Sequence, residues 1–395
     1  MPVELILAGN GPGELSGWIA PVARAARRGI PDLRLTLALS PSQFAGGREL
    51  QVVQTWNLFD RILEPRTCLR VAAGLEALPV AETATLIHLG GDLWLSGRLA
   101  SRIHRPACAL VETTLVARRH QMFSRLFAVS TGVAADLTAS GVPREKIIMT
   151  GDPRVDAISE TILPGLTSAP GTSAIPTISI LASSRDRIFT IAALYFLRAG
   201  AALRSQSGAV RFKMIVSPYV SPSVWMGARE DAARRWPGLD VEWVTGEPWP
   251  AVAASDLVVT IPGTNTLELA ILGVPFVVVL DTDLVTVAPV EGVLDWVTRA
   301  PGLRRLRRAL LLRRLSQLRF AALPNIRAGR EIVPELIGRW TPEELAKQIA
   351  ALLRSPAKRD EIRQALQDTF TQPPGASRAI VDAALALAHS GLNTR

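Results

Sequence analysis

Short hydrophobic runs alternate with longer segments of helical periodicity in the first part of the chain. The segment at 19–28 has the length and spacing of a helix, and the strand-like runs lie at 3–8, 33–39, 85–90 and 127–130. Such alternation is typical of βαβ units, in which helices join parallel strands. We therefore predict a parallel β-sheet covered by helices in this part of the chain.

A second alternation of the same kind follows. Its strand-like runs lie at 178–182, 213–216, 241–244, 257–261 and 276–280. The stretch between the two alternations is uncharged and rich in Pro, Gly, Ser and Thr, which is the composition of a linker. From about residue 341 the pattern becomes helical, and a Thr-Pro-Glu-Glu start resembles an N-cap followed by proline.

These patterns predict an α/β fold with two Rossmann-like domains facing each other across a cleft, and with C-terminal helices. We place the N-terminal domain at 1–165, the linker at 166–177 and the C-terminal domain at 178–345. The helices at 346–395 are expected to pack back across the domains.

The composition narrows the class of protein. With 395 residues, 48% hydrophobic and 20% charged, the chain is not disordered, collagen-like or a coiled coil. Its two cysteines make neither a disulfide framework nor a zinc motif. The N-terminus lacks the cationic region of a signal peptide, and the longest uncharged apolar stretch, 269–280, is shorter than the roughly 20 residues of a membrane-spanning helix. We expect a soluble cytoplasmic protein that holds no metal and no organic cofactor.

A glycine-rich segment, Gly-Asn-Gly-Pro-Gly at 9–13, follows the first predicted strand. It departs from the dinucleotide-binding pattern, because residue 14 is glutamate and the strand at 33–39 ends in Ser-Pro instead of an acidic residue for a ribose. A nicotinamide enzyme is therefore disfavoured. The glycines either hold a polar substrate group with their backbone N–H groups or only form a tight turn.

The segment 261–268, Ile-Pro-Gly-Thr-Asn-Thr-Leu-Glu, carries a strand into a helix through small residues. Backbone N–H groups and the helix dipole at such a turn favour a diphosphate, and Glu268 is placed to accept hydrogen bonds from a ribose. The alternative is structural, because Asn265 and Glu268 have the spacing of a capping box. The spacing alone leaves both interpretations open.

Two other predicted strands end in charged residues. Asp92, in Gly-Gly-Asp, follows the strand at 85–89, and open α/β sheets bind their ligands at such strand ends. An aspartate in a turn also commonly serves only to bind the backbone. Arg185, in Ser-Ser-Arg, follows the first strand of the second alternation, where it is placed either to bind a phosphate or to form a surface ion pair.

The net charge is +9, and arginines concentrate at 302–321, where leucines lie near one helical face. This pattern is typical of a basic amphipathic helix in an anionic membrane interface, with a solvated helix face as the alternative. We expect no nucleic-acid partner, because the stretch lacks aromatic residues for base stacking and any known motif. The predicted membrane-facing residues are Arg304, Arg305, Arg307 and Arg308.

The segment 323–336, Leu-Pro-Asn-Ile-Arg-Ala-Gly-Arg-Glu-Ile-Val-Pro-Glu-Leu, resembles the lipid-A-disaccharide synthase family closely. That family also has a Gly-Thr-x-x-Leu-Glu element followed by Leu-Gly-Val-Pro, a Gly-Ser-Arg loop, a Gly-x-Asp after a strand and an N-terminal Ala-Gly motif. The matching segments come in the same order, at 263–268, 272–275, 183–185, 90–92 and, loosely, 8–14.

The resemblance implies a GT-B glycosyltransferase that uses a UDP-sugar with inversion and without a metal. In the family the donor is a UDP-diacylglucosamine and the acceptor a diacylglucosamine phosphate at the membrane surface. By position, Asp92 would be the general base, and Asn10, Gly13 and Glu14 would lie on the acceptor side. The donor UDP would be bound by Ser184, Arg185, Gly263, Thr264, Glu268, Asn325, Arg330 and Glu331.

The chain departs from the family mainly in its acceptor-binding half. The acidic residue after Ala-Gly is Asn10 here, the glycine of Gly-Ser-Arg is Ser183, and a tryptophan-containing segment is replaced by 112–118. The expected partners are thus a UDP-sugar, a lipid-linked sugar acceptor and the inner face of the cytoplasmic membrane, and a homodimer is left open. A UDP-sugar 2-epimerase and a non-catalytic UDP-sugar-binding protein of the same fold are the alternatives.

Overall fold

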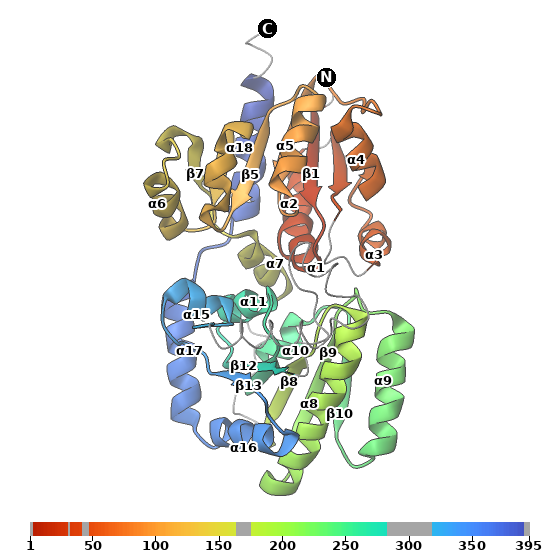
Figure 1. Cartoon of the computed structure of the whole chain (residues 1–395), viewed down its shortest axis with the longest axis vertical. Helices are drawn as coiled ribbons and strands as arrows, with labels where there is room; N and C mark the ends of the chain where they lie inside the picture. Colours follow the sequence, from red (N-terminus) through yellow and green to blue (C-terminus); the bar gives the residue numbers. More distant parts are fainter. Residues whose placement is uncertain (1–2, 31, 42–46, 163–174, 283–317, 391–395) are drawn as a thin grey trace, which may run out of the picture. The chain divides into compact units, whose positions relative to one another are not determined.

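The computed structural model describes residues 3–30, 32–41, 47–162, 175–282 and 318–390 (Figure 1). The chain forms two compact units. Unit 1 comprises Met1–Glu160 and Gln372–Arg395, and unit 2 comprises Thr161–Thr371. Each unit is built around one parallel β-sheet with helices on both faces. The predicted α/β class with two Rossmann-like domains is therefore confirmed.

The sheet of unit 1 has seven parallel strands in the order β3-β2-β1-β4-β5-β6-β7. The strands are β1 (Val3–Gly9), β2 (Leu33–Leu39), β3 (Arg61–Leu63), β4 (Thr83–His88), β5 (Ala107–Val111), β6 (Arg125–Ala128) and β7 (Ile147–Met149). Every residue of β4 and β5 is buried, as both faces of the sheet are covered. Parallel strands of this kind appear in a sequence as continuous apolar runs.

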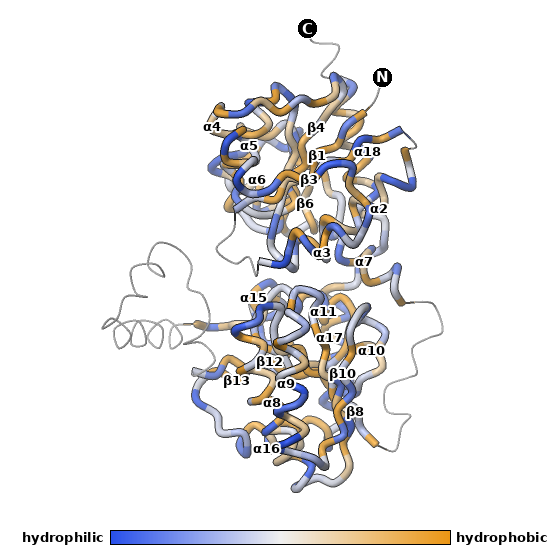
Figure 2. The backbone as a smooth tube through the Cα atoms, turned by 90° about the vertical axis from the view of Figure 1, so that its right-hand side faces the viewer, coloured by the Kyte–Doolittle hydropathy of each residue, from blue (hydrophilic) through white to orange (hydrophobic). Residues whose placement is uncertain are grey.

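The helices of unit 1 form two layers, seen on opposite sides of the sheet in Figure 2. One layer contains α4 (Pro65–Ala73), α5 (Leu93–Arg102), the 3₁₀ helix η2 (Thr114–Met122) and α6 (Thr131–Ala139). The other contains α2 (Ala20–Gly29) and α18 (Ala376–Ser390). The remaining short helices are α1 (Pro12–Glu14), the π-helix η1 (Leu15–Ile19), α3 (Glu49–Thr55), η3 (Arg144–Lys146) and α7 (Pro153–Thr161).

The sheet of unit 2 has six parallel strands in the order β10-β9-β8-β11-β12-β13. The strands are β8 (Thr177–Leu181), β9 (Arg211–Val216), β10 (Val241–Thr245), β11 (Leu257–Thr260), β12 (Phe276–Asp281) and β13 (Glu335–Gly338). The helices are α8 (Asp186–Ser207), α9 (Pro222–Arg235), α10 (Trp249–Ala253), α11 (Asn265–Leu272), α15 (Leu323–Ala328), α16 (Pro342–Leu353) and α17 (Pro356–Phe370).

Helix α8 is long and apolar enough to cross a membrane, the one such helix among the described residues. Its side chains Phe189, Phe196 and Leu197 are buried in the core of unit 2, where α8 packs against α16 and α9. Length and composition are shared by membrane spans and by central helices of soluble domains, and the packing of α8 is that of a core helix.

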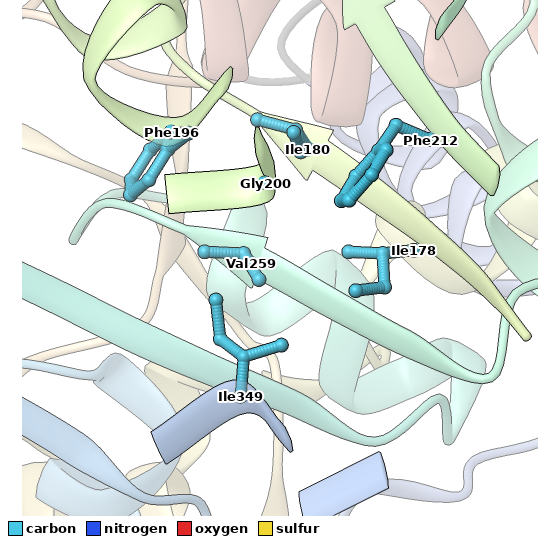
Figure 3. A pocket seen from close by; sticks show the side chains of 7 residues that line it. All are labelled: Ile178, Ile180, Phe196, Gly200, Phe212, Val259 and Ile349. Carbon is cyan, nitrogen blue, oxygen red and sulfur yellow. The ribbon is translucent and has the colours of Figure 1, made fainter. Parts of the chain in front are cut away.

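A small apolar cavity lies between α8, α16 and the sheet of unit 2 (Figure 3). Its volume is about 10 Å³, and only apolar side chains and Gly200 line it. A site of this size without polar groups holds neither a substrate nor an ordered water. It is a packing defect in the core, and the binding sites must be sought at the ends of the strands.

The C-terminal helices are shared between the units. The sequence pattern groups 346–395 as one helical segment, whereas in the structure α16 and α17 belong to unit 2 and α18 belongs to unit 1. Asp156 of α7 holds the start of α18, because its Oδ1 and Oδ2 accept hydrogen bonds from the backbone N–H groups of Gly375 and Ser377. Helix α18 then covers α2 and β4.

Candidate functional site

In unit 1 the strand order changes direction at β1, which has β2 on one side and β4 on the other. Open α/β sheets bind ligands beyond the carboxyl ends of the strands at such a switch point. The loops that follow these three strands meet there: Ser40 N donates to Gly9 O at 3.3 Å, and Leu89 N donates to Ala8 O at 2.7 Å. The glycine-rich segment and Gly-Gly-Asp are thus brought together.

Glu14 joins these two loops. Its Oε2 accepts hydrogen bonds from the backbone N–H groups of Asn10 and Gly11, at 3.0 and 2.8 Å. Its Oε1 accepts one from Gly91 N at 3.0 Å, across 77 residues of sequence. A single carboxylate therefore holds the turn after β1 against the turn after β4. The side chain acts here as a fixed part of the loop structure.

The two glycines before Asp92 are required by this close approach. Gly90 and Gly91 have φ values of +139° and +78°, which L side chains rarely adopt. A Cβ atom on Gly90 would overlap the Glu14 carboxyl group, and one on Gly91 would overlap Ser40 Oγ. The Gly-Gly sequence therefore lets the turn that carries Asp92 lie directly against the Glu14 carboxylate.

Asp92 is exposed and is the N-cap residue of α5. Its Oδ1 accepts a hydrogen bond from Leu95 N at 2.7 Å, so the backbone-binding alternative for this residue is present in the structure. Its Oδ2 has no hydrogen-bond partner among the described residues. The cap fixes the direction of the carboxylate and leaves one oxygen free to take a proton from a ligand.

His88, at the end of β4, is buried behind this turn. Its Nδ1 lies 2.8 Å from Ser96 Oγ, and its ring packs on Phe123. Burial lowers the pKa of His88 to about 4, and the nearby Asp92 carboxylate only partly offsets this effect. The imidazole is therefore neutral at physiological pH, and at 4% exposure it does not reach a substrate.

The two other predicted acceptor-side residues lie in the same loop. Asn10 is buried and its Nδ2 donates to Ser40 O, so its amide ties the end of β1 to the end of β2. Gly13 is in the one-turn helix α1, next to Glu14. Among the predicted residues of unit 1, Asp92 is the one that presents a free carboxylate oxygen at this edge.

Unit 2 repeats this arrangement at β8, which lies between β9 and β11. Thr260 and Leu181 pair at the ends of β11 and β8, and Thr260 Oγ1 donates to Leu181 O at 3.1 Å. The Ser-Ser-Arg loop and the turn at 261–264 therefore begin side by side. The structure brings the predicted donor residues Ser184, Arg185, Gly263 and Thr264 to one switch point.

The turn at Gly263 and Thr264 is held by side chains of the helix that it opens. Thr264 is the N-cap of α11, Asn265 Nδ2 donates to Thr260 Oγ1 at 2.6 Å, and Thr266 Oγ1 donates to Gly263 O at 2.7 Å. The capping-box alternative for Asn265 and Glu268 is not formed, because Thr264 is the N-cap and Asn265 lies inside the helix and bonds back to the strand. Glu268 is 9% exposed within the first turns of α11.

The loop that carries Arg185 is anchored in a similar way. Arg185 is the N-cap residue of α8, and its backbone N–H donates to Ser183 Oγ at 3.1 Å. The next residue, Asp186, accepts hydrogen bonds from Ser221 N and Oγ, at 2.7 and 2.5 Å. These bonds join the loops after β8 and β9. Ser184 and Arg185 are half-buried.

Asn325 has a structural role that the sequence pattern does not predict. It is fully buried, its Nδ2 donates to Val333 O and Glu335 Oε1, and its Oδ1 accepts from Ile332 N and Val333 N. All of its hydrogen-bonding groups thus have partners within the fold. Glu335 belongs to the same segment, 323–336, but was not predicted as a site residue. Its carboxylate also accepts hydrogen bonds from Ala321 N and Ala322 N and completes this hydrogen-bond network.

The remaining predicted donor residues, Arg330 and Glu331, are exposed. Neither has a hydrogen bond or an ion pair with any described part of the chain. The predicted membrane-facing residues Arg304, Arg305, Arg307 and Arg308 lie outside the described residues. The described residues contain no group of three or more His, Cys, Asp or Glu side chains that could hold a metal ion.

Sequence reasoning missed a buried charge network at the same edge of the unit 1 sheet. Arg154 is 2% exposed, donates to Glu112 Oε2, and lies 3.4 Å from Asp152. Its guanidinium stacks 4.5 Å from the ring centroid of Trp18, whose Nε1 donates to Asp152 at 3.0 Å. The network joins the ends of β5 and β7 to η1. Its signal was Asp-Pro-Arg at 152–154, two residues after the short apolar run at 147–149.

Known proteins share the fold and part of the sequence. No family model matches the chain. It is 29% identical over 211 residues to the lipid-A-disaccharide synthase of Syntrophus aciditrophicus, with 52% of this chain and 48% of that protein covered. It is 30% identical over 197 residues to the Burkholderia mallei lipid-A-disaccharide synthase, and this match covers 50% of this chain and 43% of that protein. The matches thus span about half the length of these curated relatives.

Solved structures match over nearly the whole chain. Acinetobacter baumannii MurG has a TM-score of 0.56 at 13% identity, covering 98% of this chain and 100% of MurG. The Neisseria meningitidis UDP-GlcNAc 2-epimerase bound to UDP-GlcNAc has a TM-score of 0.54 at 15% identity, and the match covers 98% of this chain and 100% of the epimerase. A Staphylococcus aureus MnaA–UDP structure has a TM-score of 0.59 at 14% identity, and the match covers 96% of this chain and 95% of MnaA. At these identities the likeness shows the GT-B fold alone.

Proposed function

We propose that the protein is an inverting GT-B glycosyltransferase that transfers a sugar from a UDP-sugar donor. The observation that carries the proposal is the sequence match to lipid-A-disaccharide synthases at 29–30% identity. The fold alone suits epimerases equally well, since both MurG and UDP-GlcNAc 2-epimerases share it. By the resemblance to this family, the donor would be an acylated glucosamine on UDP and the acceptor a lipid-linked sugar at the inner face of the cytoplasmic membrane.

In this proposal the edge of unit 1 carries the acceptor chemistry. An inverting displacement requires a base that removes the proton of the acceptor hydroxyl as the new bond forms. Asp92 suits this role because Oδ1 is held by the α5 backbone whereas Oδ2 has no partner among the described residues. The proton passes from the acceptor hydroxyl to Oδ2.

The edge of unit 2 binds the donor in this proposal. The departing UDP gains negative charge as the glycosidic bond breaks, and preorganised N–H groups and cations stabilise that charge. Arg185 and the backbone at Gly263 and Thr264 lie at adjacent strand ends, which supports a diphosphate site there. Glu268 would accept hydrogen bonds from the ribose.

A UDP-sugar 2-epimerase is the second candidate, favoured by the structures that share the fold. A single assay separates the two. The purified protein is incubated with UDP-GlcNAc or its acylated forms and a panel of lipid and soluble acceptors, and both free UDP and 2-epimerised UDP-sugar are quantified. Acceptor-dependent UDP release is expected. Epimerised product without an acceptor would contradict the proposal and support the second candidate.

The donor site has its own test, which does not need the acceptor. UDP should raise the melting temperature of the wild-type protein, because a ligand that binds only the folded state stabilises it. Arg185→Ala and Glu268→Ala should each reduce that rise. Arg198→Ala, at an exposed ion pair farther along α8, is the control and should keep it. A full UDP-induced rise in both site variants would remove these residues from the donor site.

A further inference from the structure

A buried arginine lies between two carboxylates at the carboxyl edge of the unit 1 sheet. Arg154 Nη2 donates to Glu112 Oε2, and Arg154 Nη1 lies 3.4 Å from Asp152 Oδ2. The ring of Trp18 stacks on the guanidinium, and its Nε1 donates to Asp152 Oδ1 at 3.0 Å. We call Trp18, Glu112, Asp152 and Arg154 the Arg154 network. The guanidinium is therefore held by both carboxylates and by the indole ring.

The second carboxylate of the network exceeds what charge compensation requires. One anion compensates one buried cation, and Asp152, whose side chain is 3% exposed, already lies beside Arg154. With Glu112 added, the network has formally one positive and two negative charges. The Glu112 side chain is 23% exposed, whereas that of Arg154 is 2% exposed. Glu112 is therefore the charged member of the network that reaches solvent.

Glu112 follows the strand next to the one that leads to Asp92. The parallel pairing of β4 with β5 extends to His88 and Ala109. Three residues beyond this pair come Gly91 on one chain segment and Glu112 on the other. Adjacent strands of a sheet lie about 4.8 Å apart, so the two segments leave the sheet side by side. The carboxylates of Asp92 and Glu112 are thus placed to act on one ligand at this edge.

The charge of the network determines which ligand group it suits. An ionised carboxylate only accepts hydrogen bonds, and a surplus negative charge repels a phosphate but attracts a neutral donor such as a hydroxyl group. The acceptor in the proposed function is a diacylglucosamine phosphate. Its two acyl groups and its phosphate occupy three of the five hydroxyl and amino groups of glucosamine, so two stay unmodified. One of these reacts at Asp92, and the other is available to Glu112.

We propose that Glu112 binds the non-reacting hydroxyl group of the acceptor sugar and thereby selects acceptors that have two unmodified hydroxyl groups. The inference rests on the proposed function, because it takes a sugar hydroxyl as the group that reacts at Asp92. Arg154 holds the Glu112 carboxylate in one direction before the ligand arrives, and such preorganisation lowers the entropic cost of binding. Glu112 also begins the segment 112–118, in which the chain departs from the family that it resembles.

The kinetics of Glu112→Gln test this contact. UDP release is measured with UDP-GlcNAc or its acylated form as donor and diacylglucosamine phosphate in detergent micelles as acceptor. The acceptor KM should rise about 10–100-fold, because a hydrogen bond to a charged group is lost. A contact made equally in the ground state and the transition state leaves kcat unchanged, and the donor KM should also stay near wild type. The glutamine oxygen can still accept from Arg154, so the UDP-induced rise in melting temperature should persist.

The matched control is Glu160→Gln. Glu160 is another carboxylate of unit 1 that pairs with arginines, Arg24 and Arg28 of α2, and its side chain is 27% exposed. This variant should keep the wild-type acceptor KM. An equal rise in both variants would reflect the loss of any arginine pair and would overturn the proposal. An unchanged acceptor KM in Glu112→Gln would also overturn it, whether or not the melting temperature falls, and would leave Glu112 with its ion pair alone.

A deoxy acceptor, in which hydrogen replaces the non-reacting hydroxyl group, tests the contact from the side of the ligand. With the wild-type protein its KM should be about 10–100-fold higher than that of the complete acceptor. With Glu112→Gln the two acceptors should differ little, because each change removes the same hydrogen bond. An unchanged KM for the deoxy acceptor with the wild-type protein overturns the proposal without any variant. Additive losses overturn it as well, since they would place the hydroxyl group against another residue.

Acceptor binding without turnover separates this inference from the proposed function. Titration with diacylglucosamine phosphate in the absence of donor gives a Kd for the wild-type protein and for Glu112→Gln. If no UDP is released but the variant binds about 10–100-fold more weakly, the proposed transfer fails and Glu112 remains a sugar-binding residue. If UDP release requires the acceptor and the variant binds like wild type, the transfer stands and this inference fails. A wild-type protein that neither binds the acceptor nor releases UDP overturns both.

Discussion

At the residue scale, two carboxylates at the edge of the unit 1 sheet have different tasks. Asp92 caps α5 with one oxygen and keeps the other free, whereas Glu14 uses both oxygens to join two loops. Their different roles follow from exposure and from the number of backbone N–H groups each accepts. Both assignments are testable by isosteric substitution.

Asp92→Asn should lower turnover by about 10²–10⁴-fold, because the amide cannot take a proton from the acceptor. Asparagine caps a helix as well as aspartate does, so the melting temperature and the UDP-induced rise should stay near wild type. Asp92→Ala is the contrast, since it should also lose about 1 kcal/mol of stability with the cap. Full turnover in Asp92→Asn would leave Asp92 with capping as its only role.

Glu14→Gln should lower kcat on the order of 10–100-fold and leave the donor KM unchanged, because a small displacement of a reacting group is costly. The amide N–H₂ would face a backbone N–H of Asn10, Gly11 or Gly91 and push the two turns apart. The double variant with Asp92→Asn is the control for a positioning role. It should be no slower than Asp92→Asn alone, and additive losses would show that Glu14 acts independently.

At the element scale, loops after strands are fixed by side chains from distant parts of the chain. Asn325 and Glu335 hold the segment before β13, and Asp186 joins the loops after β8 and β9. Asp156 does the same for the start of α18. In each case a short polar side chain satisfies backbone N–H groups that no helix or strand would satisfy.

Asp156→Asn should destabilise unit 1 by about 1–3 kcal/mol, because its N–H₂ group would oppose a buried backbone N–H at the start of α18. Urea unfolding gives the free energy, and hydrogen exchange should show faster exchange in α18. Asp382→Asn on the same helix is the control, since its ion pair with Arg378 is exposed and worth about 0–1 kcal/mol. An equal loss of unfolding free energy in Asp156→Asn and Asp382→Asn would mean that Asp156 does not anchor α18.

At the scale of the whole molecule, unit 1 carries most of its charge in solvent, and its buried Arg154 is paired with Glu112 and Asp152. The arginines of α4, α5 and η2 are carried on the outer layer, whereas His88 sits uncharged beneath the same layer. Global stability should therefore depend on pH through this histidine.

Stability should fall as the pH is lowered from about 6.5 toward 4. His88 titrates near 6.5 when unfolded and near 4 when folded, so in that window the unfolded state binds the extra proton. The contribution of neutral His88 to the free energy of unfolding is complete above pH 6.5. Its loss on lowering the pH to about 4 amounts to roughly 3 kcal/mol. His88→Asn should flatten this part of the dependence in urea unfolding at pH 7 and pH 4.5. Parallel pH profiles for the two proteins would refute the assignment.

The sequence by itself determined the architecture and the location of the candidate sites. Parallel strands buried on both faces must be continuous apolar runs, so their positions are visible without the fold. Ligand sites in such sheets lie where strands end, so Asp92, Arg185 and the turn at 261–264 could be chosen from their places after predicted strands.

Only the tertiary structure decided what each of these side chains does. Glu14 and Gly91 are 77 residues apart, and nothing in the local pattern shows that their loops meet. Asn325 was predicted for the donor and has all its hydrogen bonds inside the fold, while Asn265 bonds to its strand and makes no capping box. Periodicity reports the burial of a segment. Hydrogen-bond partners depend on which loops and helix faces come together.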